Sequence, residues 1–442
     1  MNTTEIFLKK IDDVAQQEFP ERIYLRAKRA LLDYLCVTIA GATFQKDKLN
    51  DYIDFARPEA GPYKPVGMES TYSLKETVFL NGLNGHALDF DDGTNAGIIH
   101  LGSPIFSVLL PLAQRHGCSM REVLRAAVLG YEASFTMARS IQPRHKAMGY
   151  HATGTCGVLG IAVAVSYLLG FTESERKTAF AIACVSATGM LKVLDDGSEL
   201  KPYNVAKSAL LGLVACQMAK AGFKGHYDPL SGERGFLKMM TGTENIDFVE
   251  PLLDGTFAVE KAYTKPYAAC RYCHPSIEAA ILMREDLDIE DIERITVKTY
   301  SLAVNKHDHT DVPVSASAKM SIPYSVAVGL LYGKAGLNEY DEDHVKNEKV
   351  KTLTKKVEVY ADDDFTAAFP KVTSALVEIH IKGGNVIKKQ VDFPKGEPEN
   401  PMNDKEFFDR FCELCNFAAV ENPAAIYDAV MEDDIEKLIN II

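Results

Sequence analysis

The spacing of apolar residues changes once along this chain, and that change is the strongest constraint on its fold. Over the first half, apolar residues recur every three or four positions in long stretches, which is typical of packed helices. Ser73 with Glu76 and Ser119 with Glu122 have the spacing of capping boxes, a common start of a helix. The sequence therefore predicts helices over 23–42, 73–90, 119–141, 157–171 and 205–223, and no strand of any length before about residue 290.

The second pattern is the alternation of apolar and polar residues, which is typical of strands. It occurs in four segments, and Gly383-Gly384-Asn385 between the last two predicts a β-hairpin. A helical stretch at 321–333 interrupts the strands, and the connector at 395–401 returns the chain to helix. The predicted strands are 292–301, 355–362, 374–382 and 386–393.

These patterns predict a mainly α fold with two domains. We expect a large all-helical domain over 1–264 that is completed by 400–442, and a smaller α/β (α+β) domain over 265–399. We find no GxGxxG after a strand and no Walker loop, so a nucleotide cofactor is not indicated.

Charge and composition exclude several classes of function. The 442 residues carry 48 Lys and Arg against 61 Asp and Glu, a formal charge of −13. A field of that sign repels a phosphate backbone, which argues against nucleic-acid binding. The apolar stretches are too short and too rich in glycine for membrane spans, and the N-terminus does not have the pattern of a signal peptide. We expect a cytoplasmic protein whose nine cysteines are reduced.

The pentapeptide CRYCH, from Cys270 to His274, matches the pattern of c-type haem attachment. Haem attachment normally accompanies export of the protein, and we find no export signal in this sequence. A zinc site would need a second pair of cysteines, and Cys412 with Cys415 has the right spacing. That pair lies in a segment of helical periodicity, so its cysteines are interpreted as part of a buried helical stripe.

Polar clusters interrupt the apolar helices and are the candidates for chemistry. The first contains His86, Asp89, Asp91 and Asp92 and is followed by His100; if the helix continues through 90, Asp89 and Asp92 share one face. Carboxylates of this kind can bind Mg²⁺, although one cluster is a weak metal signal. The other clusters are His151 in a Gly/Thr-rich turn, Lys201 with Lys207, the segment from Lys265 to His274, and His307-Asp308-His309, which is interpreted as solvated surface.

Six stretches of the chain, four of which contain clusters described above, occur in an order that resembles the MmgE/PrpD superfamily. They are HALDFDDG with the following His-Leu-Gly, GYHATGTCG, KPYNVAKSALLG, KPYAACRYCH, AKMSIPYSVA and KGEPENPM, and the resemblance covers nearly the whole chain. It implies a helical domain, a smaller α/β lid domain, a cleft between them, a homodimer, no metal and no organic cofactor. The haem-like spacing is then accidental, because Cys273 falls in a variable position.

The resemblance also implies the site residues. By motif, His151, His100, Lys265 and Lys201 are expected to be catalytic, and Asp89, Cys270, Arg271, His274 and Tyr324 to bind the substrate. Some positions depart from the family's pattern. Gly93 and Cys270 argue against cis-aconitate decarboxylase itself, and Asn204 and Ala206 replace a usual His and Gly of the dehydratase pattern.

The activity that we expect is a cofactor-free lyase that acts on a small di- or tricarboxylate, similar to 2-methylcitrate dehydratase. Removing a proton beside a carboxylate creates an anion that Lys201, Lys265 and Arg271 would stabilise, while His151, with His100 as its partner, would move the proton. The alternatives are an epimerase of an imino- or amino-dicarboxylate, a cis-aconitate decarboxylase-like enzyme, and a binding protein for small carboxylates that catalyses nothing.

Overall fold

The computed structural model describes residues 1–194, 198–244 and 256–442, and the chain in it divides into two compact units. Unit 1 comprises Met1–Leu194, Leu200–Ala262 and Asp404–Ile442, and Tyr263–Asn403 forms the main part of unit 2. The fold class is confirmed, because the structure is mainly α with a smaller α/β region.

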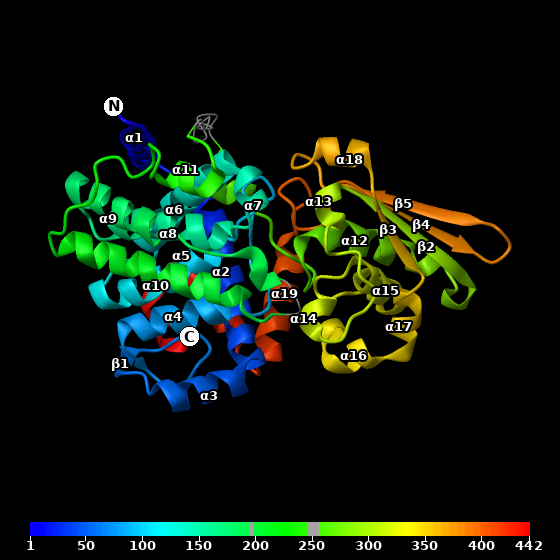
Figure 1. Cartoon of the computed structure of the whole chain (residues 1–442). Coiled ribbons are helices and arrows are strands. Elements are labelled where there is room, and N and C mark those ends of the chain that lie inside the picture. Colours follow the sequence, from blue (N-terminus) through cyan, green and yellow to red (C-terminus); the bar gives the residue numbers. More distant parts are fainter. Residues whose placement is uncertain (195–197, 245–255) are drawn as a thin grey trace. The chain divides into compact units, whose positions relative to one another are not determined.

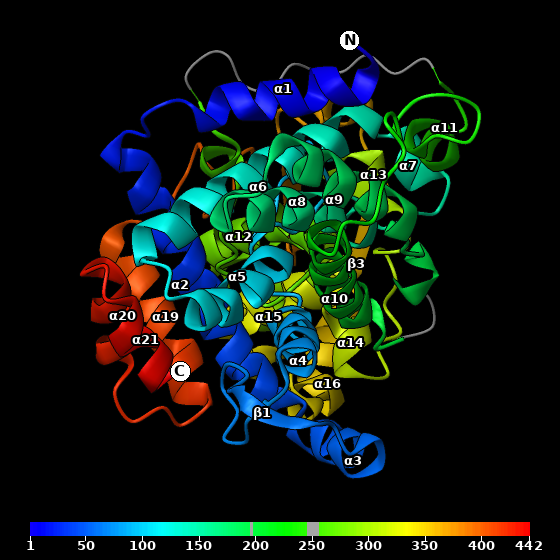
Figure 2. The ribbon, with the colours of Figure 1, turned by 90° about the vertical axis from the view of Figure 1, so that its left-hand side faces the viewer.

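Unit 1 is built from helices that pack around α8 (Figure 2). The core helix α8 contacts α5, α6, α9 and α10, and its residues from Ala152 to Ser166 are buried. The elements of unit 1 are α1 (Thr3–Ala15), α2 (Glu21–Phe44), α3 (Lys46–Ala56), β1 (Ala60–Tyr63), α4 (Leu74–His86), α5 (Gly102–His116), α6 (Met120–Ile141), α7 (Arg144–Ala147), α8 (Ala152–Leu168), α9 (Glu173–Ser186), η1 (Leu191–Leu194), α10 (Lys201–Lys220), α11 (Phe236–Thr241), η2 (Ala258–Lys261), α19 (Asp404–Phe417), α20 (Pro423–Met431) and α21 (Ile435–Ile441).

Glycines explain the close packing of α6 on α8. Glycines allow the backbones of α6 and α8 to approach closely: a Cβ on Gly160 would lie 1.8 Å from Ser134 Oγ and 2.6 Å from the carbonyl oxygen of Gly130. The C-terminal segment then returns to unit 1, where α19 and α20 pack on α2 (Figure 2).

None of the helices in the described part of the chain is long and apolar enough to cross a membrane.

Unit 2 contains a mixed four-stranded sheet with the order β3-β2-β4-β5 (Figure 1). Strand β2 is parallel to β3 and antiparallel to β4, and β4 and β5 form the predicted hairpin. Helix α12 packs on β4 and β5, and α15 packs on β3. The elements of unit 2 are η3 (Arg271–Cys273), α12 (His274–Met283), η4 (Arg284–Asp286), η5 (Ile289–Asp291), β2 (Ile292–Thr299), α13 (Ser301–Val304), α14 (Ser315–Ala318), α15 (Ile322–Tyr332), η6 (Asn338–Tyr340), α16 (Glu342–Lys346), α17 (Glu348–Thr354), β3 (Val357–Ala361), α18 (Asp363–Ala368), β4 (Ala375–Ile381) and β5 (Val386–Val391).

Local expectations differ from the structure at several places, among them the starts of α8 and α10, which lie five and four residues before the predicted ones. The four-residue β1 is a strand that the periodicity missed, because it is too short to alternate recognisably. Helix α4 ends at His86 rather than at residue 90. The capping box of α6 is present, with both the Ser119 and Glu122 side chains bonded, whereas the Ser73 side chain forms no capping hydrogen bond at the start of α4.

Candidate active site

The loop over 87–101, between α4 and α5, carries several of the predicted site residues. Asp89 has a φ of 51°, which lies in the left-handed region that Asp tolerates better than most residues. A right-handed helix cannot continue through that conformation. The prediction that Asp89 and Asp92 share a helix face is therefore wrong, and the two carboxylates have different surroundings.

The Asp92 carboxylate anchors this loop on the start of α5. It accepts hydrogen bonds from the backbone N–H groups of Gly102 (2.8 Å) and Leu101 (3.3 Å) and from the Tyr131 hydroxyl (2.7 Å). Burial, together with the nearby Asp33 carboxylate, raises the pKa of Asp92 to about 7. Its bonds to the scaffold give Asp92 a structural role.

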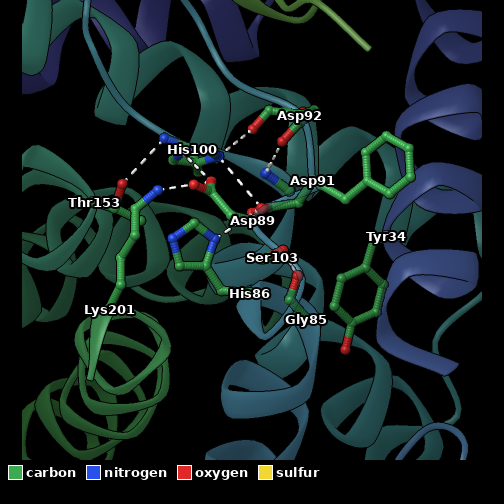
Figure 3. Close-up of polar contacts among 12 residues, drawn as sticks. Tyr34, Gly85, His86, Asp89, Asp91, Asp92, His100, Ser103, Thr153 and Lys201 are labelled. Atoms are coloured by element: carbon green, nitrogen blue, oxygen red, sulfur yellow. Dashed lines mark hydrogen bonds and ion pairs between the residues drawn. The ribbon is translucent and has the colours of Figure 1, made fainter. Parts of the chain in front are cut away.

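Asp91 lies between two imidazoles (Figure 3). Its Oδ1 is 2.8 Å from His86 Nδ1 and 3.4 Å from His100 Nδ1, and all three side chains are buried. Burial opposes the charge of Asp91, but the two imidazoles hold its pKa well below the ordinary value. Burial also lowers the pKa of His86 to about 4. Asp91 is therefore an ionised carboxylate that accepts a hydrogen bond from the neutral His86 ring.

The surroundings of His100 determine which of its ring nitrogens carries the proton. Its Nδ1 lies 2.8 Å from the carbonyl oxygen of Asp92, which can only accept. Nδ1 is therefore the donor, and the neutral ring carries its lone pair on Nε2. That nitrogen lies 3.7 Å from Asp89 Oδ1. The backbone N–H of His100 also donates to Thr153 Oγ1, which ties the loop to α8 (3.1 Å; Figure 3).

Lys201 brings a positive charge to the same group from the first turn of α10. Its ammonium lies 2.7 Å from Asp89 Oδ1, and the two side chains are 14% and 9% exposed (Figure 3). The approach depends on close packing of α10 on α4, where a Cβ on Gly82 would lie 2.7 Å from the Cα of Ala206. The ion pair holds the Lys201 ammonium beside the His100 imidazole, whose Nε2 lies 3.7 Å from the same oxygen of Asp89.

His151 is the residue at the N-cap position of α8, and Asn204 contacts its ring. Asn204 Nδ2 lies 3.2 Å from His151 Nδ1, and Lys207 donates to Asn204 Oδ1 at 3.1 Å, which fixes the orientation of the amide. His151 Nδ1 therefore accepts, and the proton of the neutral ring is on Nε2. Burial and then Lys201 lower the pKa of His151 well below its ordinary value. The ring stacks on His86 with centroids 6.1 Å apart.

Unit 1 thus brings together four residues that the sequence predicts for the site, namely Asp89, His100, His151 and Lys201. Sequence reasoning did not assign a role to His86 or Asp91. Both lie in the same polar segment as Asp89. Their spacing of five residues within that segment was the feature of the sequence from which a role in the site could have been inferred. The neutral His86 and the charged Asp91 complete a buried polar cluster among apolar helices.

Four side chains of this cluster could hold a metal ion. The possible ligand atoms of His86, Asp89, Asp91 and His100 all lie within 4.8 Å of one another in the described part of the chain. Two imidazoles and two carboxylates are a suitable set for a divalent cation such as Zn²⁺. The Lys201 ammonium argues against a metal ion here, because it already supplies positive charge to Asp89.

In unit 2, Arg271 and His274 form a buried network. Arg271 is ion-paired with Glu397, and its Nη1 lies 2.9 Å from His274 Nδ1. His274 Nε2 lies 3.1 Å from the carbonyl oxygen of Ala269. Two motifs, KPYAACRYCH and KGEPENPM, meet through these contacts. The Arg271 charge is balanced within the protein by Glu397.

The remaining predicted residues of unit 2 are Lys265, Tyr324 and Cys270. Lys265 is 1% exposed, and the buried Tyr324 donates its hydroxyl to the carbonyl oxygen of Glu339 (2.8 Å). Cys270 is half-buried, and its thiol lies 3.6 Å from His307 Nε2. The interpretation of His307 as solvated surface is wrong, because the ring is 8% exposed and packs against Tyr272.

Family comparisons cover both units of the chain. Residues 5–249 match the model of the MmgE/PrpD N-terminal domain, and residues 267–433 match that of the MmgE/PrpD C-terminal domain.

Among individual proteins, the chain is 24% identical over 444 residues to a cis-aconitate decarboxylase-like protein of Aspergillus oryzae, covering 94% of this chain and 91% of that protein. It is 23% identical to human cis-aconitate decarboxylase, covering 92% and 86%. It is 25% identical over 276 residues to 2-methylcitrate dehydratase of Salmonella typhimurium, covering 57% and 53%.

Proposed function

The chain belongs to the MmgE/PrpD family and is an enzyme of its lyase type, and from this premise we propose that it abstracts a proton beside a carboxylate of a small di- or tricarboxylate. The observation that carries the proposal is the buried cluster of unit 1, in which His100 lies beside Asp89 and Asp91, Lys201 is paired with Asp89, and His151 stacks on His86. A carbanion beside a carboxylate needs a base to form it and fixed positive charge to stabilise it.

His100 is the base in this proposal. Its Nδ1 donates to the carbonyl oxygen of Asp92, so the lone pair is on Nε2. After taking the proton, the ring would be an imidazolium with Asp91 3.4 Å from Nδ1 and Asp89 3.7 Å from Nε2. These carboxylates stabilise the positive charge that the base acquires, which favours abstraction of the proton.

His151 is the hydrogen-bond donor to the leaving group. Asn204 donates to its Nδ1, which places the proton of the neutral ring on Nε2. Burial and the Lys201 charge keep this ring neutral. In a dehydration, the Nε2–H of His151 would donate a hydrogen bond to the departing hydroxyl, and the proton that His100 takes from carbon would leave with that hydroxyl as water.

Lys201 is the fixed cation that holds a substrate carboxylate and stabilises the developing negative charge. Its bond to Asp89 keeps the ammonium in place before the substrate arrives, so little reorganisation is needed when charge develops. Removing one preorganised group of this kind costs about 2.7 to 4 kcal/mol of transition-state stabilisation.

A second candidate is decarboxylation of a cis-aconitate-like substrate. Two relatives that match over more than nine-tenths of this chain are named a cis-aconitate decarboxylase-like protein and cis-aconitate decarboxylase. Loss of CO₂ leaves a carbanion that must be protonated; a protonated His100 would supply that proton and then be reprotonated from water. Lys265, Cys270, Arg271, His274 and Tyr324 stay predicted substrate-binding or catalytic residues, and a homodimer, a cytoplasmic location and epimerase activity also stay predictions.

The experiment is a proton NMR assay of the purified chain in heavy water with 2-methylcitrate, cis-aconitate and iminodisuccinate, run separately. Dehydration gives a new alkene, decarboxylation loses a carboxyl carbon, and epimerisation exchanges one carbon-bound proton without a net loss. Failure of all three substrates to react or to exchange deuterium would contradict the proposal. The same assay after dialysis against EDTA tests the cofactor-free mechanism, which predicts unchanged turnover; activity lost on chelation and restored by a divalent ion would contradict it.

A further inference from the structure

Cys270, which stays a predicted substrate-binding residue, forms a pair with His307 in unit 2, and the proton transfers proposed above give this pair no role. The thiol of Cys270 lies 3.6 Å from His307 Nε2. On the other side of the ring, Nδ1 lies 2.8 Å from the carbonyl oxygen of Asn305, which can only accept. His307 Nδ1 is therefore the donor, and the lone pair of the neutral ring is on Nε2, facing the thiol.

The surroundings of His307 hold this orientation. The ring is 8% exposed and meets the Tyr272 ring edge-on, with centroids 5.2 Å apart and planes at 85°. Its backbone carbonyl accepts from the N–H of Ile322 (2.8 Å), and its own N–H donates to the carbonyl oxygen of Val304 (3.1 Å). A nucleophile, a base within reach and a third group that orients the base are the arrangement that activates cysteine nucleophiles.

The other cysteines provide the comparison. Six of the nine are buried, and only Cys118, Cys270 and Cys412 are half-buried. Burial raises the pKa of Cys118, and the charge of Glu122 raises it further. Burial also raises the pKa of Cys412, and the charge of Asp409 raises it further. These two thiols have similar exposure but surroundings that disfavour the thiolate, which is the reactive form.

We propose that Cys270 is a nucleophilic thiol activated by His307 and is a site of covalent modification by soft carbon electrophiles, including α,β-unsaturated acids. His307 Nε2 takes the thiol proton, and the sulfur electron pair forms the new S–C bond. With an alkyl iodide, the C–I pair leaves as iodide. With an unsaturated acid, the alkene pair moves to the carbon beside the carbonyl, which takes the proton back from the imidazolium.

The test measures alkylation of the intact protein by limiting iodoacetamide at pH 7, with the rate at each cysteine read from peptide mass spectrometry. We expect Cys270 to react about tenfold faster than Cys118 and Cys412, since a larger thiolate fraction outweighs the lower nucleophilicity of a more acidic thiol. N-ethylmaleimide, a conjugate acceptor, should give the same order. His307→Gln should lower the rate at Cys270 to that of the other two.

His309→Gln is the matched control, because His309 belongs to the same loop but its Nε2 faces Ser317 (3.1 Å). It should leave the rate at Cys270 unchanged. Equal rates at the three cysteines in the wild-type protein would overturn the proposal, as would a folded His307→Gln variant that reacts like the wild type. Reaction of iodoacetamide at the six buried cysteines would reveal that the His307→Gln variant is unfolded. In that case the wild-type rates at the three half-buried cysteines, together with the His309→Gln control, decide whether the proposal holds.

Discussion

Single side chains decide the protonation of the candidate site. Asp91 is fully buried and stays ionised because His86 and His100 both face it. His86 stays neutral because burial outweighs the attraction of Asp91. The two remaining imidazoles have opposite tautomers, since His100 donates through Nδ1 and His151 accepts through Nδ1. In the neutral rings this opposition leaves a lone pair on His100 Nε2 and a proton on His151 Nε2, and the proposed roles of base and hydrogen-bond donor rest on that difference.

The tautomers predict different defects for two variants. His100→Gln removes the base, so we expect turnover to fall by about 10² to 10⁴ and exchange of the substrate's carbon-bound proton with heavy water to fall equally. His151→Gln removes the donor, so we expect a similar loss of turnover while proton exchange continues. Both rates are measured by NMR on the substrate that the screen identifies.

His116→Gln is the control for these two variants, because His116 is exposed at the end of α5. It should leave both rates unchanged. If His100→Gln retains full exchange while His151→Gln loses it, the assignment of base and donor is reversed.

A second prediction concerns Glu132, a buried carboxyl on α6. Burial raises the pKa of Glu132 to about 8, and the charge of Glu260 acts in the same direction. A hydrogen bond from the Ala258 N–H lowers the pKa but does not outweigh burial. Between pH 5 and 8 the folded protein keeps this proton and the unfolded chain releases it, so Glu132 reduces the free energy of unfolding as pH rises. Glu132→Gln stays neutral in both states. We expect its advantage over the wild type to grow by about 1.4 kcal/mol per pH unit across that range.

The measurement is urea unfolding of both proteins at pH 5, 6, 7 and 8, followed by circular dichroism. Near pH 5 the two should differ least, which makes this point the internal reference. A difference in unfolding free energy that is constant over the four pH values would show that Glu132 is ionised in the folded state as well.

The secondary-structure elements were predicted well where one period runs through a whole segment. The helix at 119–141 and the strand at 292–301 match α6 and β2 within two residues. The end of α4 was missed because it depends on a left-handed residue, Asp89, and apolar spacing carries no information about φ. The tautomer of His100 was unpredictable for a related reason: it depends on a backbone carbonyl, that of Asp92, which only the folded loop places.

The two Ser/Glu pairs give a prediction about helix starts. Ser119 accepts from the Glu122 N–H and Glu122 bonds back to Ser119, whereas the Ser73 side chain makes no capping bond. We expect Ser119→Ala to lower the free energy of unfolding by about 1 kcal/mol, and Ser73→Ala to lower it by clearly less. Denaturant titrations of the two variants test this directly. Equal losses would mean that sequence spacing predicts the cap better than the geometry does.

Across the whole molecule, the six motifs separate into two groups of three. HALDFDDG, GYHATGTCG and KPYNVAKSALLG meet in unit 1 through Asp89, His100, His151 and Lys201. In unit 2, KPYAACRYCH meets KGEPENPM through Arg271 and Glu397, and it meets AKMSIPYSVA where the Cys270 N–H donates to the carbonyl oxygen of Lys319. The order of the motifs was visible in the sequence. Their partners were not, because Arg271 and Glu397 are far apart along the chain and only the fold pairs them.

This division predicts that residues 263–403 fold alone. The segment is continuous, contains all four strands of the sheet, and closes on itself where the Thr264 N–H donates to the carbonyl oxygen of Gly396 (2.9 Å). Its sheet has a buried face of its own, with Ile295, Val297 and Val377 all 0% exposed. A domain of this size can bury enough apolar surface to fold without support.

We therefore expect the isolated fragment to give a far-UV circular dichroism spectrum of mixed helix and strand and to unfold cooperatively on heating. It should also keep the rapid alkylation of Cys270, since both Cys270 and His307 lie within it. It should show no turnover, because the proposed base His100, the proposed hydrogen-bond donor His151 and Asp89 are all in unit 1. A fragment that lacks a cooperative transition would contradict the independence of unit 2, and turnover by the fragment alone would move the chemistry away from His100 and His151.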